Sequence, residues 1–303
     1  MAICVERLCY EQEEITRLKP TVIWHPKTKK TKELTGIAIA ILIFATWEWL
    51  KPVPTIGDWQ SHVAIMPTAD IDDDSVTVHK VRNFRYSEAE TASVIGYYDR
   101  TYDLSKLTRI WFVAEPFSQS GNAAHTFLSF EFDDGNHLAI SIEARKKNGQ
   151  EYGVFRGLLR AYPLMYVATD EHDAVMVRTN VRKHEVYMYP VRTTPDKARA
   201  VLVDMLRTMN DLTVHPRWYN TLSANRTSLL VGHVNHVTPH RLPDWSWQLL
   251  FTGHADELAL ASGLLDTDLP IDTARKKYGI TAISQNIGDV ENYSDLIRQE
   301  LRK

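Results

Sequence analysis

The sequence predicts a mixed α+β domain, an antiparallel sheet with packed helices, preceded by one N-terminal transmembrane helix. Three observations support this prediction. Residues 124–132 and 136–145 alternate between apolar and polar side chains on either side of a glycine-containing turn, which is typical of a β-hairpin. Residues 194–212 have the periodicity of an amphipathic helix, with Pro195 in its first turn. Residues 34–50 are almost entirely apolar.

The register of the hairpin follows from its apolar pattern. The apolar sets of the two arms must share the buried face, because a slip of one residue would turn one set to the other face. These sets are Thr126, Leu128, Phe130 and Phe132 in the first arm and Leu138, Ile140, Ile142 and Ala144 in the second. Phe132 then lies opposite Asn136, and Gly135 ends a three-residue turn where a left-handed backbone is needed.

The same register places His125 directly opposite Glu143. Opposed residues on neighbouring strands have Cβ atoms about 4.5–5.5 Å apart, so this carboxylate can hydrogen-bond the imidazole. A histidine oriented by a carboxylate is the usual general base beside a nucleophile. The alternative is that both side chains are solvated on the polar face of the hairpin, and the hairpin alone does not decide between the two.

Composition excludes several classes of protein. A chain of 303 residues, 44% of them hydrophobic, can bury a sizeable core in one large or two small domains. The formal net charge is -3 and no basic stripe with interleaved aromatic residues occurs, so nucleic-acid binding is disfavoured. Cys4 and Cys9 are the only cysteines, which excludes a disulfide or a cysteine-based zinc site in the rest of the chain.

The apolar segment is predicted to be an uncleaved signal-anchor helix within residues 34–52. Trp47 and Trp49 can lie at the far interface, and no small-residue cleavage site follows. Four lysines precede the segment: Lys27, Lys29, Lys30 and Lys32. By the positive-inside rule, residues 1–33 are cytoplasmic, and a domain of residues 58–303, with a C-terminal helical extension, lies outside the cytoplasm.

Further elements are expected along this domain. Strands are predicted at 63–66, 75–84, 109–114, 164–168, 174–177 and 186–189, and helices at 155–162, 255–261 and 293–302. Residues 118–122 form a loop before His125. Asp70 and the aspartates at 72–74 mark a solvated turn, because they lack the glycine and the closing glutamate of an EF-hand.

Another helix is predicted to begin near Asn225, where Asn, Thr and Ser side chains supply capping oxygens. The first turn of a helix offers backbone amides and the positive end of the helix dipole. These lower the pKa of a thiol and stabilise an oxyanion. A fold of this kind would hold its nucleophile here, and we expect Arg226 to point from this helix towards His125 and Glu143.

Six separated motifs carry a resemblance to a known family. They are residues 81–86 (VRNFRY), 100–104 (RTYDL), 124–126 (AHT), 141–145 (SIEAR), 166–171 (YVATDE) and 219–225 (YNTLSAN). In this order and spacing they resemble the Lnb N-terminal periplasmic domain family of bacterial lipoprotein N-acyltransferases, over most of residues 58–300. The resemblance implies a permuted papain-like fold, related to the NlpC type, in which a strand-borne histidine precedes a helix-borne cysteine.

The resemblance also implies roles for single residues. His125 matches the family's base and Glu143 its orienting residue. The family's nucleophile is the cysteine of an Asn-Cys-Thr motif, and this sequence has Arg226 there, between Asn225 and Thr227.

Substrate binding is expected from Ser129, Arg145 and Asn225, with no metal ion and no cofactor. The implied partners are a phospholipid acyl donor, a bacterial lipoprotein acceptor and the membrane. The implied location is the bacterial inner membrane, crossed once, with the domain in the periplasm.

The reaction that the resemblance implies is N-acylation of lipoproteins through an acyl-thioester. A guanidinium group cannot be deprotonated in a protein and forms no thioester, so this chain is not expected to run the reaction as written. Three explanations stay open: an inactive variant of an active enzyme, a natural pseudoenzyme, or an error in the sequence. The intact remainder of the motif set favours the first and the third.

Other functions are weighed against this one. A non-catalytic lipid- or lipoprotein-binding pseudoenzyme could use Arg226 to hold a phosphate or carboxylate. A cysteine-type hydrolase or peptidase relative is a second alternative. A metallohydrolase based on His233, His236 and His240 is less favoured, because no acidic ligand lies at a familiar spacing. The glycosylation sequon at 225–227 coincides with the predicted site and is taken as chance.

Overall fold

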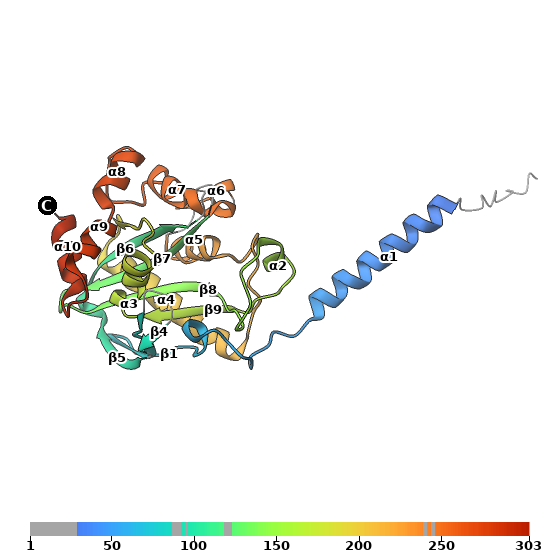
Figure 1. The fold of residues 1–303 in the computed structure, drawn as a ribbon, viewed down its shortest axis with the longest axis horizontal. Helices are drawn as coiled ribbons and strands as arrows, with labels where there is room; N and C mark the ends of the chain where they lie inside the picture. The colour runs from blue at the N-terminus through green and yellow to red at the C-terminus, as the bar shows by residue number, and fades with distance from the viewer. Residues whose placement is uncertain are drawn as a thin grey trace, which may run out of the picture. The chain divides into compact units, whose positions relative to one another are not determined.

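The computed structural model describes residues 29–86, 92–94, 96–117, 123–238, 241–243 and 246–302. The chain divides between Lys51 and Pro52 into two units. The first contains helix α1 (Lys29–Leu50), labelled in Figure 1. Within the described ranges, α1 is the one helix long and apolar enough to cross a membrane. The predicted loop 118–122 lies outside the described residues.

The second unit is built on an eight-stranded sheet. Its strand order is β1-β2-β9-β8-β7-β6-β10, and β5 pairs with β2 as well. Neighbouring strands are antiparallel except β2 and β9, which are parallel. The strands are β1 (Thr68–Ile71), β2 (Ser75–Arg82), β5 (Tyr97–Asp103), β6 (Leu107–Pro116), β7 (Ala124–Phe132), β8 (His137–Ala144), β9 (Leu164–Thr169) and β10 (Tyr187–Pro190). The predicted α+β class is confirmed.

The central hairpin, β7 and β8, has the predicted register. Phe130 pairs with Leu138, and the amide of Phe132 donates to the carbonyl of Asn136 at 3.0 Å. Gly135 has φ +80, as the predicted turn requires. All eight apolar side chains assigned to one face are buried. Alternation and turn chemistry together were therefore sufficient to fix the pairing.

The opposite face of the hairpin is buried too, so the alternative of a solvated His125 is wrong. His125 is 7% exposed and Ser129 is fully buried. These strands lie inside the sheet, and helices cover both of its faces, as Figure 1 shows for α3 (Glu171–Met176) and α4 (Pro195–Val214). Thr227 of α5 (Arg226–Val237) contacts Thr126 on one face, whereas Ser129 donates to Glu171 of α3 on the other.

The long helix α4 (Pro195–Val214) fills the core on its face of the sheet. Thr194 caps it by accepting from the amide of Lys197, and Pro195 is its first residue, as predicted. Its buried stripe is Ala198, Val201, Leu202, Met205, Leu206, Met209 and Leu212. The remaining helices are α2 (Val154–Leu158), α3 (Glu171–Met176), α5 (Arg226–Val237), α6 (Trp247–Leu250), α7 (Ala255–Ala261), α8 (Ile271–Tyr278), α9 (Thr281–Ile287) and α10 (Tyr293–Leu301).

The strand predicted at 63–66 is wrong. A 3₁₀ turn (Ser61–Val63) lies there instead, and the first strand is β1. Val63 packs against Met165 and Val167 of β9. The apolar side chain of Val63 is explained by this packing, so it is no evidence of strand pairing.

The strand predicted at 174–177 is also wrong, because these residues belong to α3 and to a π-helical turn (Val177–Val181) after it. Asp170 caps α3 by accepting from the amide of His172. Glu171 and Asp173 lie in its first turn, where acidic side chains favour a helix. A short helix buried on every side has the same apolar run as a buried strand, which explains the error.

Candidate active site

His125 and Glu143 lie beside each other at one end of the central hairpin. Nε2 of His125 is 3.3 Å from Oε1 of Glu143, and their side chains are 8% and 14% exposed. The geometry therefore agrees with the cross-strand pair that the register predicts.

Arg226 joins this pair from α5, of which it is the first residue. Asn225 caps the helix, since its side-chain oxygen accepts from the amide of Ser228 at 2.9 Å, while Ser228 Oγ accepts from the amide of Asn225 at 3.0 Å. Nη2 of Arg226 lies 3.0 Å from Oε2 of Glu143. The carboxylate of Glu143 thus lies between His125 and Arg226, and the structure brings the three residues together.

Burial controls the protonation of this trio. It lowers the pKa of His125 to about 3, and the charges of Arg178 and Arg226 act in the same direction against the attraction of Glu143. Burial would raise the pKa of Glu143, but His125 when protonated, Arg226 and Arg178 hold it well below its usual range. The site at neutral pH therefore contains a neutral imidazole, a carboxylate and a guanidinium.

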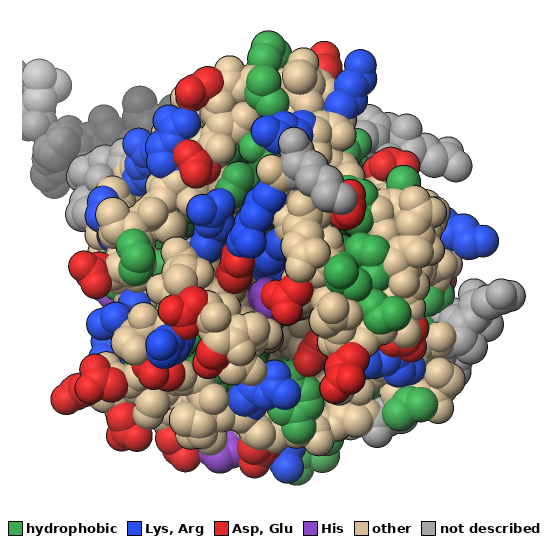
Figure 2. Space-filling model, turned by 90° about the vertical axis from the view of Figure 1, so that its left-hand side faces the viewer, with side chains coloured by type: hydrophobic (Ala, Val, Ile, Leu, Met, Phe, Trp, Pro, Cys, Tyr) green, Lys and Arg blue, Asp and Glu red, His purple; other side chains and the backbone are tan. Residues whose placement is uncertain are grey.

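A cavity of about 530 Å³ opens over the trio. Five of its lining residues are cationic (Arg82, Lys146, Arg178, Arg182 and Arg226), two are acidic (Glu115 and Glu143) and three are histidines (His62, His125 and His184). Asp173, which lies outside the lining, neutralises Arg82, so four other cationic side chains stand against two carboxylates and the cavity favours an anionic ligand. By contrast, Figure 2 shows charged side chains of both signs interspersed over one face of the molecule.

Glu115 is a second carboxylate beside His125, which it faces across β6 and β7. Arg178 Nε lies 2.7 Å from its Oε2, and His184 Nδ1 lies 2.8 Å from its Oε1. Burial opposes ionisation, but Arg178 and the His184 hydrogen bond lower the pKa of Glu115 to about 2. Pairing the predicted strand 109–114 with the hairpin would have found Glu115. Arg178 was missed because the residues before it, 174–177, were predicted as a strand and not as a helix leading into the turn that holds Arg178.

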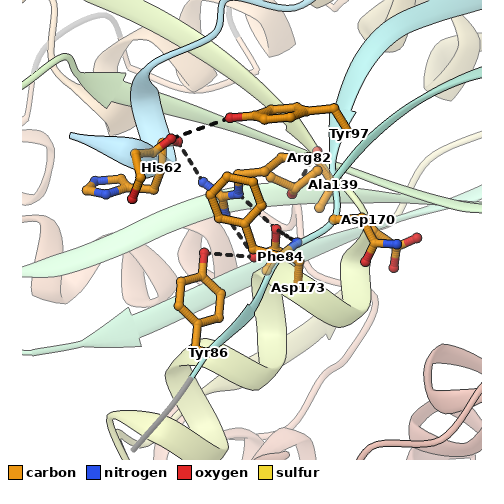
Figure 3. A network of polar contacts seen from close by, with 12 residues as sticks. His62, Arg82, Phe84, Tyr86, Tyr97, Ala139, Asp170 and Asp173 are labelled. Atoms are coloured by element: carbon orange, nitrogen blue, oxygen red, sulfur yellow. Dashed lines mark hydrogen bonds and ion pairs between the residues drawn. The ribbon is translucent and has the colours of Figure 1, made fainter. Parts of the chain in front are cut away.

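One wall of the cavity is a fixed ion pair between Arg82 and Asp173 (Figure 3). Nε and Nη2 of Arg82 donate to the two oxygens of Asp173 at 2.8 and 3.0 Å, and Nη1 donates to the carbonyl of His62 at 2.9 Å. Tyr86 and the amide of Phe84 donate to the same carboxylate. Such bidentate pairing holds the Arg82 side chain in one orientation.

The three residues expected to bind substrate lie outside the lining of this cavity. Ser129 donates to Glu171. Arg145 donates to the carbonyls of Val63 and Ala64 at 2.9 and 2.6 Å. Asn225 caps α5. Each has protein partners that position an element, and substrate binding by these residues stays a prediction.

The histidines weighed as metal ligands lie away from the cavity. His233 and His236 of α5 both pair with Asp204 of α4, at 2.6 and 2.8 Å. His233 also contacts the hydroxyl of Tyr166 at 2.6 Å. His240 lies outside the described residues. Among the residues that were placed, no cluster of three or more His, Cys, Asp or Glu side chains could hold a metal ion.

Fold and site together define a mixed α+β domain with an open, cation-rich cavity over a histidine–carboxylate pair. The family model of the Lnb N-terminal periplasmic domain matches residues 96–253, and the chain belongs to this family. It therefore contains an Lnb-type periplasmic domain, and α1 fits a single membrane crossing. Comparison with curated proteins and with solved structures finds no match.

Acid is expected to destabilise the fold through His125. Its pKa falls from an ordinary 6.5 to about 3, so between these values the unfolded chain binds a proton that the native state does not. Stability therefore falls by about 1.4 kcal/mol for each pH unit below 6.5. In denaturant titrations at pH 7 and 5, His125→Gln should reduce this loss, whereas the exposed His215→Gln should not. Equal pH dependence in all three chains would contradict a buried neutral His125.

Proposed function

We propose that this chain is a membrane-anchored acyltransferase-like protein that holds a phospholipid in its cavity without transferring the acyl chain. The observation that supports this best is the position of Arg226. It is the first residue of α5, in contact with Glu143 beside His125. This is where a thiol nucleophile would be served by a base, an oriented carboxylate and the amides of a helix start.

The family reaction has two steps. A thiolate at the start of α5 would attack the ester carbonyl of a phospholipid, forming a thioester and releasing the lysophospholipid. The α-amine of a diacylated lipoprotein cysteine would then attack the thioester, forming the amide and restoring the thiol. His125 would accept the thiol proton and pass it to the departing alkoxide, and Glu143 would orient the imidazole.

With arginine at position 226 the first step has no thiol nucleophile, because no cysteine follows Cys9 in the sequence. The lipoprotein acceptor and the periplasmic face of the inner membrane are parts of the same proposal. In this proposal the chain has lost the nucleophile but keeps the cavity that binds the phospholipid donor.

The binding part of this proposal is supported by the excess of cationic side chains in that cavity. Arg182 lines the cavity with its side chain 32% exposed, so it can reach a ligand. Its planar fork suits a phosphodiester or phosphomonoester group. Glu115 lies 3.5 Å from Arg182 and is also paired with Arg178 at 2.7 Å.

The proposal predicts that the detergent-purified full chain binds phosphatidylglycerol, measured by native mass spectrometry. Arg182→Gln should weaken binding about tenfold, since a hydrogen bond to a charged group contributes about 1.5–3 kcal/mol. Lys183→Gln is the matched control, because Lys183 is the exposed neighbour and does not line the cavity. Equal binding by both variants, or no binding by the unsubstituted chain, would count against a headgroup in this cavity.

A further inference from the structure

The short helix α2 presents large apolar side chains to solvent. Phe155 is 80% exposed, Val154 55% and Leu159 49%. Leu222, which is 56% exposed, follows Thr221, whose hydroxyl donates to the carbonyl of Val154 at 3.0 Å. These four apolar side chains, Val154, Phe155, Leu159 and Leu222, form what we call the α2 patch.

The backbone beneath the α2 patch is held firmly. The amide of Gly153 donates to the hydroxyl of Tyr162 at 2.9 Å, and that hydroxyl donates to the carbonyl of Glu151 at 2.7 Å. Gly157 packs so closely on Thr221 that a side chain there would have no room. The backbone that carries the apolar side chains is therefore fixed by hydrogen bonds and close packing.

Cationic side chains flank the α2 patch in the sequence. Residues 146–160 contain Lys146, Lys147, Arg156 and Arg160 but one acidic residue, Glu151. Lys147 and Arg156 are exposed. Apolar side chains ringed by lysine and arginine are typical of segments that lie in the interface of an anionic bilayer.

The chain itself limits how far the α2 patch can be from a membrane that holds α1. Helix α1 ends at Leu50. Asp58 and Trp59 then form backbone contacts with the loop after β8. The carbonyl of Asp58 accepts from the amide of Asn148, and Trp59 bridges to Lys147. The residues between, 51–57, span at most roughly 25 Å when fully extended. The tether thus reaches the domain at the loop that leads directly into α2.

The α2 patch also borders the cavity. Tyr152, just before α2, lines it, and the guanidinium of Arg226 lies 5.8 Å from the centre of the Tyr152 ring. An element that contacts lipid and also forms a wall of the cavity would bring a bilayer ligand to the site without full extraction into water.

We infer that the α2 patch is a second membrane contact, inserted into the headgroup region of an anionic bilayer. This inference rests on the proposed placement of α1 in the membrane, and it does not depend on acyl transfer. We infer an anionic bilayer as the partner of the patch for two reasons. Cationic side chains lie next to the patch in the sequence, and the segment that joins α1 to the domain is short.

The test uses the full chain with Cys4→Ser and Cys9→Ser, and one new cysteine labelled with the dye NBD. Phe155→Cys reports on the α2 patch. Val290→Cys is the control, an exposed apolar residue between α9 and α10. Asp295 of α10 is 3.6 Å from His137 at the start of β8, whereas α2 follows the end of that strand, so the control lies at the opposite end of the sheet.

Both labelled proteins are reconstituted into vesicles of phosphatidylcholine with phosphatidylglycerol, with and without nitroxide-labelled lipid. The Phe155 probe should shift to shorter wavelength and be quenched at least about twofold, because interfacial side chains lie about 5–10 Å into the headgroup boundary. The Val290 probe should do neither. Adding Arg156→Glu should reduce the quenching at Phe155, and omitting phosphatidylglycerol should do the same.

Three results would overturn the inference. Equal emission from both probes would show that α2 stays in water. A shifted Phe155 probe that nitroxide lipid fails to quench would assign the α2 patch to a protein contact such as a second copy of the chain. Protein that does not float with the vesicles would remove the membrane placement of α1 and, with it, the reach argument. Vesicle flotation without quenching rejects the α2 contact and leaves the proposed function standing.

Discussion

Arg226→Cys is expected to give the chain thiol-dependent acyl-transfer activity that the unsubstituted protein lacks. The new thiol would stand at the start of α5, where the helix dipole lowers its pKa. Removing the guanidinium takes away a charge that disfavours protonation of His125, so the imidazole becomes a better base. Glu143, released from Arg226, remains 3.3 Å from His125 to orient it.

The measurement is lipoprotein N-acylation in membranes that contain each variant. Arg226→Ala is the matched control, because it removes the same cation without supplying a nucleophile and should stay inactive. Adding His125→Ala to Arg226→Cys should lower the rate about 10²–10⁴-fold, the usual contribution of a general base. A stably folded Arg226→Cys protein without activity, or full activity in the unsubstituted chain, would refute the acyltransferase proposal.

Arg298→Met is expected to destabilise the domain by about 3–5 kcal/mol, as removal of one partner of a buried ion pair usually does. Both guanidinium arms of Arg298 in α10 lie 2.6 Å from the oxygens of Glu171, and both side chains are fully buried. The substitution leaves the Glu171 carboxylate buried in the core without the guanidinium that neutralises its charge. Unfolding in urea, followed by circular dichroism, measures the loss.

Arg302→Met is the matched control, from the same helix end. Arg302 pairs with Glu131 but is 54% exposed, so its loss should cost less than about 1 kcal/mol. Combining Arg298→Met with Glu171→Gln should recover part of the stability, because the unpaired charge is removed. Similar losses for Arg298→Met and Arg302→Met would argue against a structural role for the buried pair.

The central hairpin and its histidine–carboxylate pair could be predicted because they depend on local rules. Alternation fixes the face and Gly135 fixes the turn, and the register then determines the partner of His125. The start of α5 was equally predictable, since Asn225 and Ser228 form a capping box within four residues of sequence.

The cationic lining of the cavity could not be predicted in the same way. It is assembled from β2, the segment after β8, the turn after α3, and α5, which are far apart in the chain. Arg178 also lies in a segment whose apolar run suits a strand or a buried helix equally well. Ser129 and Arg145 were polar residues near the predicted site, but their contacts with Glu171 and with the carbonyls at 63–64 depend on elements whose packing no local pattern specifies.

The pair between Glu171 and Arg298 has a consequence for how the domain is made. The buried carboxylate of Glu171 is paired with a side chain that comes 127 residues later in the sequence. Domains generally fold as units during synthesis and export. For this protein the charge of Glu171 has no guanidinium partner until α10 is present, so the domain can reach its native packing only when nearly the whole chain is available.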